Sequence, residues 1–146
     1  VELLLLQTEL LQRLGRSSEA IAPAQAALAL AEKSSREFTQ TFRERQRVRA
    51  LAGMGQIDEA ITAARQAVEL VPAASLQARW GREATLAAIL ARAGRTQECV
   101  GLLAKLLRTP SGLTVPMLRI DPAWDNVRDD AGFKALLAEP KNSAPL

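Results

Sequence analysis

The sequence contains no histidine and no tyrosine, and its only cysteine is Cys99. The absence of histidine excludes imidazole acid–base catalysis and histidine metal ligation. A single cysteine forms neither an intrachain disulfide nor a thiolate zinc site. Since no nucleophile–base pair and no cofactor motif is visible either, we expect a protein without catalytic activity, cofactor or bound metal.

Aromatic and β-branched residues are also scarce, whereas the 146 residues include 27 alanines and 23 leucines. This composition favours helix over strand and predicts one domain whose helices pack closely through alanine. The net charge of +3 is modest for this length. With so few aromatic rings to stack on bases, nucleic acid is not the expected partner.

No apolar run is long enough to cross a membrane, and the longest run of leucines is Leu3 to Leu6. No signal peptide is visible. We therefore expect a cytoplasmic location, while a periplasmic one stays open if a parent protein has an upstream membrane span. Because the chain begins with valine inside a helical pattern, we expect it to be a piece of a longer protein.

One short pattern occurs three times: a glycine, three variable residues, a glutamate, a small residue and a β-branched residue. It occupies residues 15–21, recurs 40 residues later at 55–61, and recurs after a further 39 residues at 94–100. Apolar residues on both sides of each glycine follow helical spacing. This period predicts a stack of helical hairpins that each turn at their glycine.

The expected helices span residues 2–14, 18–33, 36–53, 58–71, 77–93 and 97–108. The turn glycines suit the left-handed conformation that closes a helix. The expected N-caps of the return helices are Ser17 or Ser18, Asp58 and Thr96. Pro23 lies inside the first return helix and is expected to loosen or kink it.

After residue 110 the pattern changes to a segment, 111–138, that we expect to cap the stack before a flexible tail at 139–146. Asp121 before Pro122 is typical of a helix start, and Asp129 or Asp130 is expected to begin a last helix that ends near Leu137. The end of a solenoid needs such a cover. Its apolar side would consist of Trp124, Phe133, Leu136 and Leu137.

The stretch from Gly55 to Pro72 resembles the turn and second helix of the tetratricopeptide repeat (TPR). It reads Gly-Gln-Ile-Asp-Glu-Ala-Ile-Thr-Ala-Ala-Arg-Gln-Ala-Val-Glu-Leu-Val-Pro. The resemblance covers residues 1–110, although the family's first-helix tryptophan, glycine and tyrosines are missing and the period exceeds the usual repeat of about 34 residues. It implies an all-α, right-handed solenoid of about three hairpins with a short helical cap, and a non-catalytic scaffold for protein–protein interaction.

Residues 118–137 are similar to the closing segment of bacterial multidomain regulators, in which TPR repeats follow a kinase, adenylyl cyclase or winged-helix domain. That family pattern is Leu-Asp-Pro-x-Trp-x-x-Leu-Arg-x-Asp-Pro-x-Phe-x-x-Leu-Leu. This chain departs from it at Ile120, Val127 and Ala131. The similarity implies that the chain is the regulatory C-terminal end of such a protein.

In the TPR family the first helix of each hairpin lines a concave groove that holds a peptide. Counted from the turn glycine, the groove positions here are Arg13, Phe42, Arg45, Arg49 and Arg92. Arginines at these positions would bind an acidic peptide or a C-terminal carboxylate through charged hydrogen bonds. The alternative is a solvated helix face on which Glu37 and Glu44 are the partners of the arginines.

Two features that resemble reactive sites have simpler explanations. Cys99 takes the small-residue slot held by Ala20 and Ala60 in the other repeats, so we expect a buried and unreactive thiol. The aspartates between residues 121 and 130 lack the spacing of a calcium loop, and we expect them to cap helices rather than bind metal.

The first expected helix carries a stripe of leucines, Leu3, Leu6, Leu10 and Leu14. We expect much of this stripe to pack on the return helix. An earlier repeat would cover the remainder if the chain is a fragment, and an exposed remainder would mediate homodimerisation. Two alternatives to a ligand-binding groove stay open. One is a purely structural or dimerising segment, and the other is an accessory domain that shapes the active site of a neighbouring enzyme.

Overall fold

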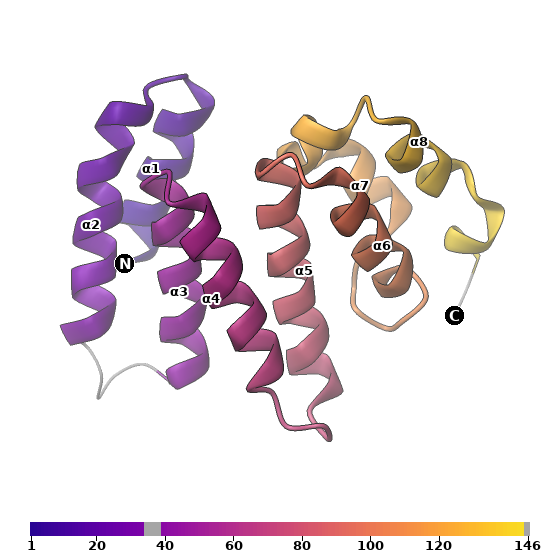
Figure 1. Cartoon of the computed structure of the whole chain (residues 1–146), viewed down its shortest axis with the longest axis horizontal. Helices are drawn as coiled ribbons and strands as arrows, with labels where there is room; N and C mark the ends of the chain where they lie inside the picture. Colours follow the sequence, from indigo (N-terminus) through magenta and orange to yellow (C-terminus); the bar gives the residue numbers. More distant parts are fainter. Residues whose placement is uncertain (34–38, 145–146) are drawn as a thin grey trace. The chain divides into compact units, whose positions relative to one another are not determined.

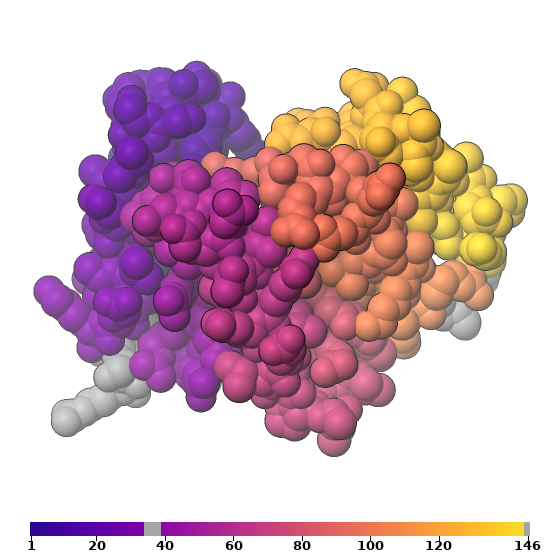
Figure 2. All heavy atoms as spheres, in the orientation of Figure 1, coloured from indigo at the N-terminus to yellow at the C-terminus, as the bar shows by residue number. Residues whose placement is uncertain are grey.

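The computed structural model describes residues 1–33 and 39–144, and within these ranges every regular element is a helix. The predicted all-α class is therefore confirmed. The chain divides into two compact units, Val1–Glu69 and Leu70–Leu146. Side chains fill the gaps between the ribbons within each unit (Figure 2). No helix of the described residues is long and apolar enough to span a membrane.

The first unit consists of two antiparallel helical hairpins (Figure 1). Helices α1 (Glu2–Arg13) and α2 (Ser17–Lys33) form one hairpin, and α3 (Gln40–Gly53) and α4 (Ile57–Glu69) form the other. The second hairpin packs on the first mainly through α2 and α3, with a smaller contact between α1 and α3. The start predicted for the third helix at residue 36 lies outside the described residues.

The second unit begins with a third hairpin and ends in short helices. The hairpin consists of α5 (Leu76–Arg92) and α6 (Thr96–Leu106). The elements that follow are α7 (Val115–Ile120), η1 (Pro122–Val127), α8 (Ala131–Ala138) and η2 (Pro140–Asn142). Helix α8 packs against α6, where Phe133, Leu103 and Leu106 are completely buried. Helix α7 lies in the segment 111–138, for which the sequence predicted helix starts only at Asp121 and at Asp129 or Asp130.

The three predicted turn glycines have the conformation that their position requires. Gly15, Gly55 and Gly94 have φ of 74°, 79° and 70°. The residue after each glycine donates its amide to a carbonyl five residues earlier, with N···O distances of 2.8, 3.0 and 2.9 Å. This 6→1 bond closes the helix and leaves the glycine in a region that strains other residues. The prediction of three equivalent turns is confirmed.

The predicted N-caps of the return helices are wrong, because each helix begins directly after its tight turn. Ser17 and Thr96 are the first residues of α2 and α6, and Asp58 is the second residue of α4. Thr96 donates its hydroxyl to the Gly94 carbonyl instead of accepting an amide. The carbonyls of Arg16, Gln56 and Arg95 accept the amide of the fourth residue of each helix, which is the first regular helical hydrogen bond.

Helix α2 runs without interruption from Ser17 to Lys33 and includes Pro23, which is buried. The predicted loosening at this proline is therefore not seen. Its position in the second turn of the helix limits the loss to a single backbone hydrogen bond near the helix start.

The predicted starts of the closing helices are largely confirmed. Asp121 accepts the amide of Ala123 at 2.9 Å and begins η1, while Asp130, not Asp129, accepts the amide of Phe133 at 3.0 Å and begins α8. The tail, however, is ordered further than expected. Asn142 is buried and donates to the Leu136 carbonyl at 2.9 Å, so η2 is held against the end of α8.

The core of the first unit is built from small side chains. Ala24, Ala27 and Ala50 are completely buried, and Ala27 and Ala50 meet Leu5 in one cluster. A Cβ atom on Gly53 would lie 2.5 Å from Thr8 Cγ2 and 3.2 Å from Ala24 Cβ. The first and second hairpins therefore approach more closely at Gly53 than any larger residue permits.

Replacing Gly53 with alanine is expected to destabilise the first unit by about 1–3 kcal/mol, because the added methyl overpacks this contact. Gly101→Ala in α6 is the matched control, since its Cβ would meet nothing within 4 Å. In a helix interior that change is expected to stabilise by about 1 kcal/mol. Thermal and urea unfolding followed by circular dichroism measure both. Equal effects of the two substitutions would contradict the close approach.

Candidate functional site

Helix α3 carries four arginines at alternate positions, and helical geometry divides them into two pairs. Arg45 and Arg49 lie on the side of α1, where both reach Glu2. Arg43 and Arg47 lie on the side of α2, where they line a hollow with Leu28. The predicted binding residues of this helix therefore belong to the surface shared by α1 and α3.

Arg49 donates three hydrogen bonds to two glutamates of α1. Its Nε and Nη2 donate to Glu9 Oε1 at 3.1 and 2.8 Å, and its Nη1 donates to Glu2 Oε2 at 2.8 Å. The side chain is 26% exposed. Gln46, which is completely buried, donates to the other oxygen of Glu2 at 2.5 Å. These four side chains connect α1 to α3 across more than 40 residues of sequence.

The charges of this network stabilise one another. Hydrogen bonding from Arg49, and also from Gln46, lowers the pKa of Glu2 below its ordinary value of 4.5, although burial acts in the opposite direction. Burial also opposes the charge on Arg49, but the hydrogen bonds to Glu2 and Glu9 outweigh it and raise the pKa of the guanidinium. Both shifts favour the charged forms of Glu2 and Arg49, and these two residues form a structural ion network with Glu9.

Arg45 is presented to solvent. Its side chain is 56% exposed, its Nη2 lies 3.7 Å from Glu2 Oε1, and its Cζ lies 5.7 Å from the centroid of the Phe42 ring. That distance is within the range of a cation–π contact. Phe42 is half-buried near the start of α3, where Thr39 accepts its amide at 3.2 Å. The Arg45 guanidinium therefore lies over the face of the half-buried Phe42 ring.

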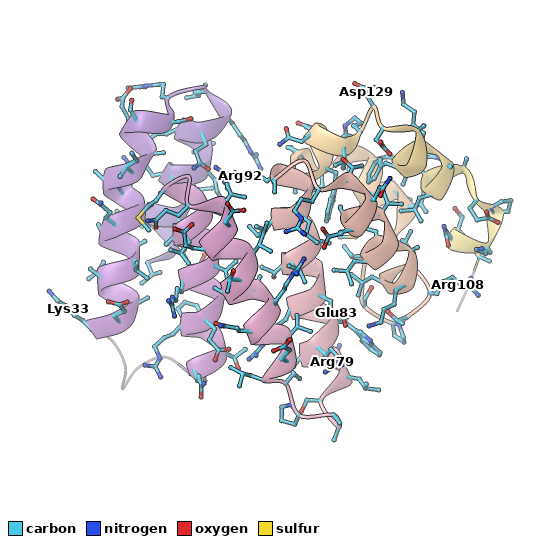
Figure 3. All side chains as sticks on the ribbon, in the orientation of Figure 1. Lys33, Arg79, Glu83, Arg92, Arg108 and Asp129 are labelled. Carbon is cyan, nitrogen blue, oxygen red and sulfur yellow. The ribbon has the colours of Figure 1, made fainter. Side chains whose placement is uncertain are left out.

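The remaining two predicted residues lie apart from this pair along the chain. Arg13 is exposed and is the last residue of α1. Arg92 is half-buried at the end of α5 in the second unit, where its carbonyl accepts the side chain of Asn126 at 3.5 Å (Figure 3). Within the first unit, then, the structure brings together Phe42, Arg45 and Arg49.

The solvated-face alternative named Glu37 and Glu44 as partners of the arginines. Glu37 lies outside the described residues, and Glu44 accepts a hydrogen bond from Gln40 at 2.9 Å. The partners of Arg49 come instead from α1. Sequence reasoning missed Glu2 and Glu9 because their pairing depends on how α1 is rotated against α3. The residues close to Glu2 and Glu9 in the sequence do not indicate which residues of α3 these glutamates contact.

A hollow of about 330 Å³ lies between α2 and α3 and was not predicted. Its charged lining consists of Glu32, Arg43, Glu44 and Arg47, and its apolar lining includes Leu28 and Ala31. Arg43 Nε is buried there without a hydrogen-bond partner in the described part of the chain. Among the described residues, two arginines and two glutamates therefore face one hollow.

The second unit contains one buried carboxylate that sequence reasoning also missed. Glu83 projects from α5, as does Arg79 (Figure 3), and its side chain is only 6% exposed. Lys105 of α6 donates to Glu83 Oε1 at 2.6 Å. Since Glu83 and Lys105 belong to the two helices of one hairpin, this ion pair fixes how the hairpin closes.

The simpler explanations of the apparent reactive sites are supported. Cys99 is buried, and burial raises the pKa of its thiol to about 11, so the nucleophilic thiolate is not formed at neutral pH. Among residues 1–33 and 39–144, no three acidic or cysteine side chains are grouped so that they could hold a metal ion. Asp121 and Asp130 cap helices, while Asp125 pairs with Arg128 at 2.7 Å and Asp129 with Lys134 at 3.3 Å.

No family model matches this chain, and no curated protein or solved structure matches it either.

The Arg49 network gives a prediction for pH. Arg49→Gln is expected to cost about 1–2 kcal/mol at neutral pH, because it removes charged hydrogen bonds to Glu2 and Glu9. The folded-state pKa of Glu2 is lowered, so the stabilisation is complete above its ordinary value of 4.5 and is lost as the pH falls through the lower folded value.

Urea unfolding of the wild type and Arg49→Gln between pH 3 and pH 7 measures this difference, which we expect to shrink toward the acidic end. Arg47→Gln is the matched control on the opposite side of α3 and is expected to change stability little at any pH. A difference for Arg49→Gln that stays constant down to pH 3 would contradict the role given to Glu2.

Proposed function

We propose that this chain is a non-catalytic protein-interaction module of the TPR type, part of a larger regulatory protein, and that it binds an acidic peptide segment or an acidic patch of a neighbouring domain. Three turns with equivalent hydrogen bonds, in a 40- and 39-residue register, support a repeat architecture. Helical repeats present extended surfaces to protein partners. The buried thiol and the paired carboxylates support a role without catalysis.

The observation that carries the acidic ligand is the arrangement of Arg45. Its side chain is 56% exposed, and among the described residues its acidic neighbour is Glu2, whose Oε1 lies 3.7 Å from Nη2. The Phe42 ring restricts its motion. A cation that is already ordered loses less conformational entropy when a carboxylate binds, and the ring beside it supplies apolar contact area.

Arg49 has a different role in this proposal. A ligand carboxylate that bound Arg49 directly would have to displace Glu2 and Glu9, which already supply three hydrogen bonds. We therefore assign Arg49 to positioning, because it holds α1 beside α3 and pairs with Glu2 and Glu9. Arg13 would contact the ligand from the end of α1, and Arg92 stays the predicted contact of the second unit.

The proposed location is the cytoplasm, with the periplasm as the alternative if the parent protein has an upstream membrane span. The two alternatives, a structural segment without a ligand and an accessory domain of an enzyme, both leave Arg45 without a binding role. A substitution at Arg45 therefore distinguishes the proposal from both. Self-association through the leucine stripe of α1 is a separate interaction, which a substitution at Arg45 does not test.

Arg45→Glu is expected to weaken binding of an acidic peptide by about tenfold or more, which corresponds to about 1.4 kcal/mol, because one charged hydrogen bond is replaced by repulsion. The probe is a fluorescein-labelled octapeptide of alternating glutamate and leucine with a free carboxylate, followed by fluorescence anisotropy. Binding is also expected to weaken as salt rises from 50 to 300 mM, since the site is exposed.

Arg47→Glu is the control, because it makes the same charge change two residues along α3 on the side of α2. Charge reversal at Arg49 is unsuitable for this test, since it places a third carboxylate beside Glu2 and Glu9 and is expected to lower stability. An unchanged affinity of Arg45→Glu, or an equal loss for Arg47→Glu, would show that the peptide does not bind at Arg45.

A further inference from the structure

Helix α1 has two opposite faces. Leu5 and Thr8 are almost completely buried against the rest of the first unit. Since an α-helix has 3.6 residues per turn, the predicted leucine stripe lies on the side opposite these two residues. The exposed fractions of Leu3, Leu6, Leu10 and Leu14 are 82%, 50%, 50% and 69%. The prediction that much of this stripe packs on the return helix is therefore wrong.

The repeat indicates what kind of surface this stripe is. One repeat later, α3 docks on the first hairpin through Gln46, Ala50 and Gly53, which are all buried. The positions 40 residues earlier, on α1, are Leu6, Leu10 and Arg13. Two of the four stripe leucines, Leu6 and Leu10, thus occupy positions that in the second hairpin pack against another helix. A contiguous row of exposed leucines at such positions is suited to helix packing.

We propose that the leucine stripe of α1 packs antiparallel against the same stripe of a second copy of this chain, forming a two-fold symmetric dimer. The spacing of the leucines fits this arrangement, because they are distributed almost symmetrically about the middle of α1. In an antiparallel pair, Leu3 of one copy faces the region of Leu14 in the other. In the same pair, Leu6 faces the region of Leu10. A two-fold contact requires such self-complementarity.

The charges beside the stripe fit the same arrangement. Glu2, Glu9 and Arg13 lie along one flank of α1, the flank on the side of α3. A two-fold axis brings this flank of one copy beside the same flank of the other, in opposite directions. Arg13 at one end then lies near Glu2 of the second copy, and this occurs twice. Glu9 lies near the middle of the flank, where Arg49 already balances its charge at 2.8 Å.

The solution mass of the full chain tests this proposal without any peptide ligand, so it stands or fails separately from the proposed function. Sedimentation velocity at 1 to 200 µM is expected to show the wild type pass from monomer to dimer. The Leu6→Glu/Leu10→Glu variant is expected to stay monomeric. Both leucines are half exposed, so its circular dichroism spectrum and melting temperature should match the wild type, which separates lost association from unfolding.

The matched control is Ile120→Glu, which places the same charge on a residue that is 79% exposed in the second unit. This variant is expected to dimerise like the wild type. Arg13→Glu tests the direction of the helices and is expected to weaken the dimer by about tenfold, whereas Arg13→Lys retains it. A wild type that is monomeric throughout, or a dimer that survives Leu6→Glu/Leu10→Glu, would overturn the proposal. A dimer indifferent to Arg13→Glu would overturn the antiparallel arrangement.

Discussion

The close approach of helices through alanine and glycine is the constraint on which the first unit depends. Ala24 and Ala27 of α2 leave space for Ala50 and Gly53 of α3, and a single added methyl at Gly53 would meet the Thr8 side chain. Small interface residues bury little apolar area each. The helices must therefore lie very close to gain dispersion contacts along their whole length. Large side chains are consequently excluded from this contact between α2 and α3.

This packing decides which side chains remain available to a partner. Because α1 and α3 lie close together, Arg49 and Gln46 reach Glu2 and Glu9, and these polar groups satisfy one another. Arg45 is left more than half exposed over Phe42. On the far side of α1, the leucines face away from the core. The pair α1 and α3 thus carries three features. Arg49 and its partners form a paired network, Arg45 is exposed to solvent, and the leucine stripe forms an apolar face.

The core of the second unit is packed with larger residues than that of the first unit. Leu103 and Leu106 take the positions that alanines occupy in the earlier return helices, and α8 covers them with Phe133. Helix starts at Asp121 and Asp130 and the buried Asn142 hold the short closing helices in place. Leu103 and Leu106 are therefore buried within the unit.

The sequence predicted features that local chemistry determines. The turns at Gly15, Gly55 and Gly94 follow from the need for positive φ, and Asp121 before Pro122 is a local helix signal. Features that depend on helix rotation were missed or wrong. The partners of Arg49 lie about 40 residues away, and the buried face of α1 proved to be that of Leu5 and Thr8 rather than the leucine stripe. Short apolar segments such as α7 give too little periodicity to be recognised.

The central claim is that Arg45 is presented for a ligand while its neighbour Arg49 is bound within the chain. A ¹⁵N–¹H correlation spectrum of the protein, titrated with the glutamate–leucine octapeptide, tests it most directly. The account predicts that the Phe42 and Arg45 amides and the Arg45 Nε–H resonance shift, while the Arg49 Nε–H resonance keeps its position. A titration that moves the Arg49 resonance first, or leaves Phe42 and Arg45 unchanged at saturation, would contradict it.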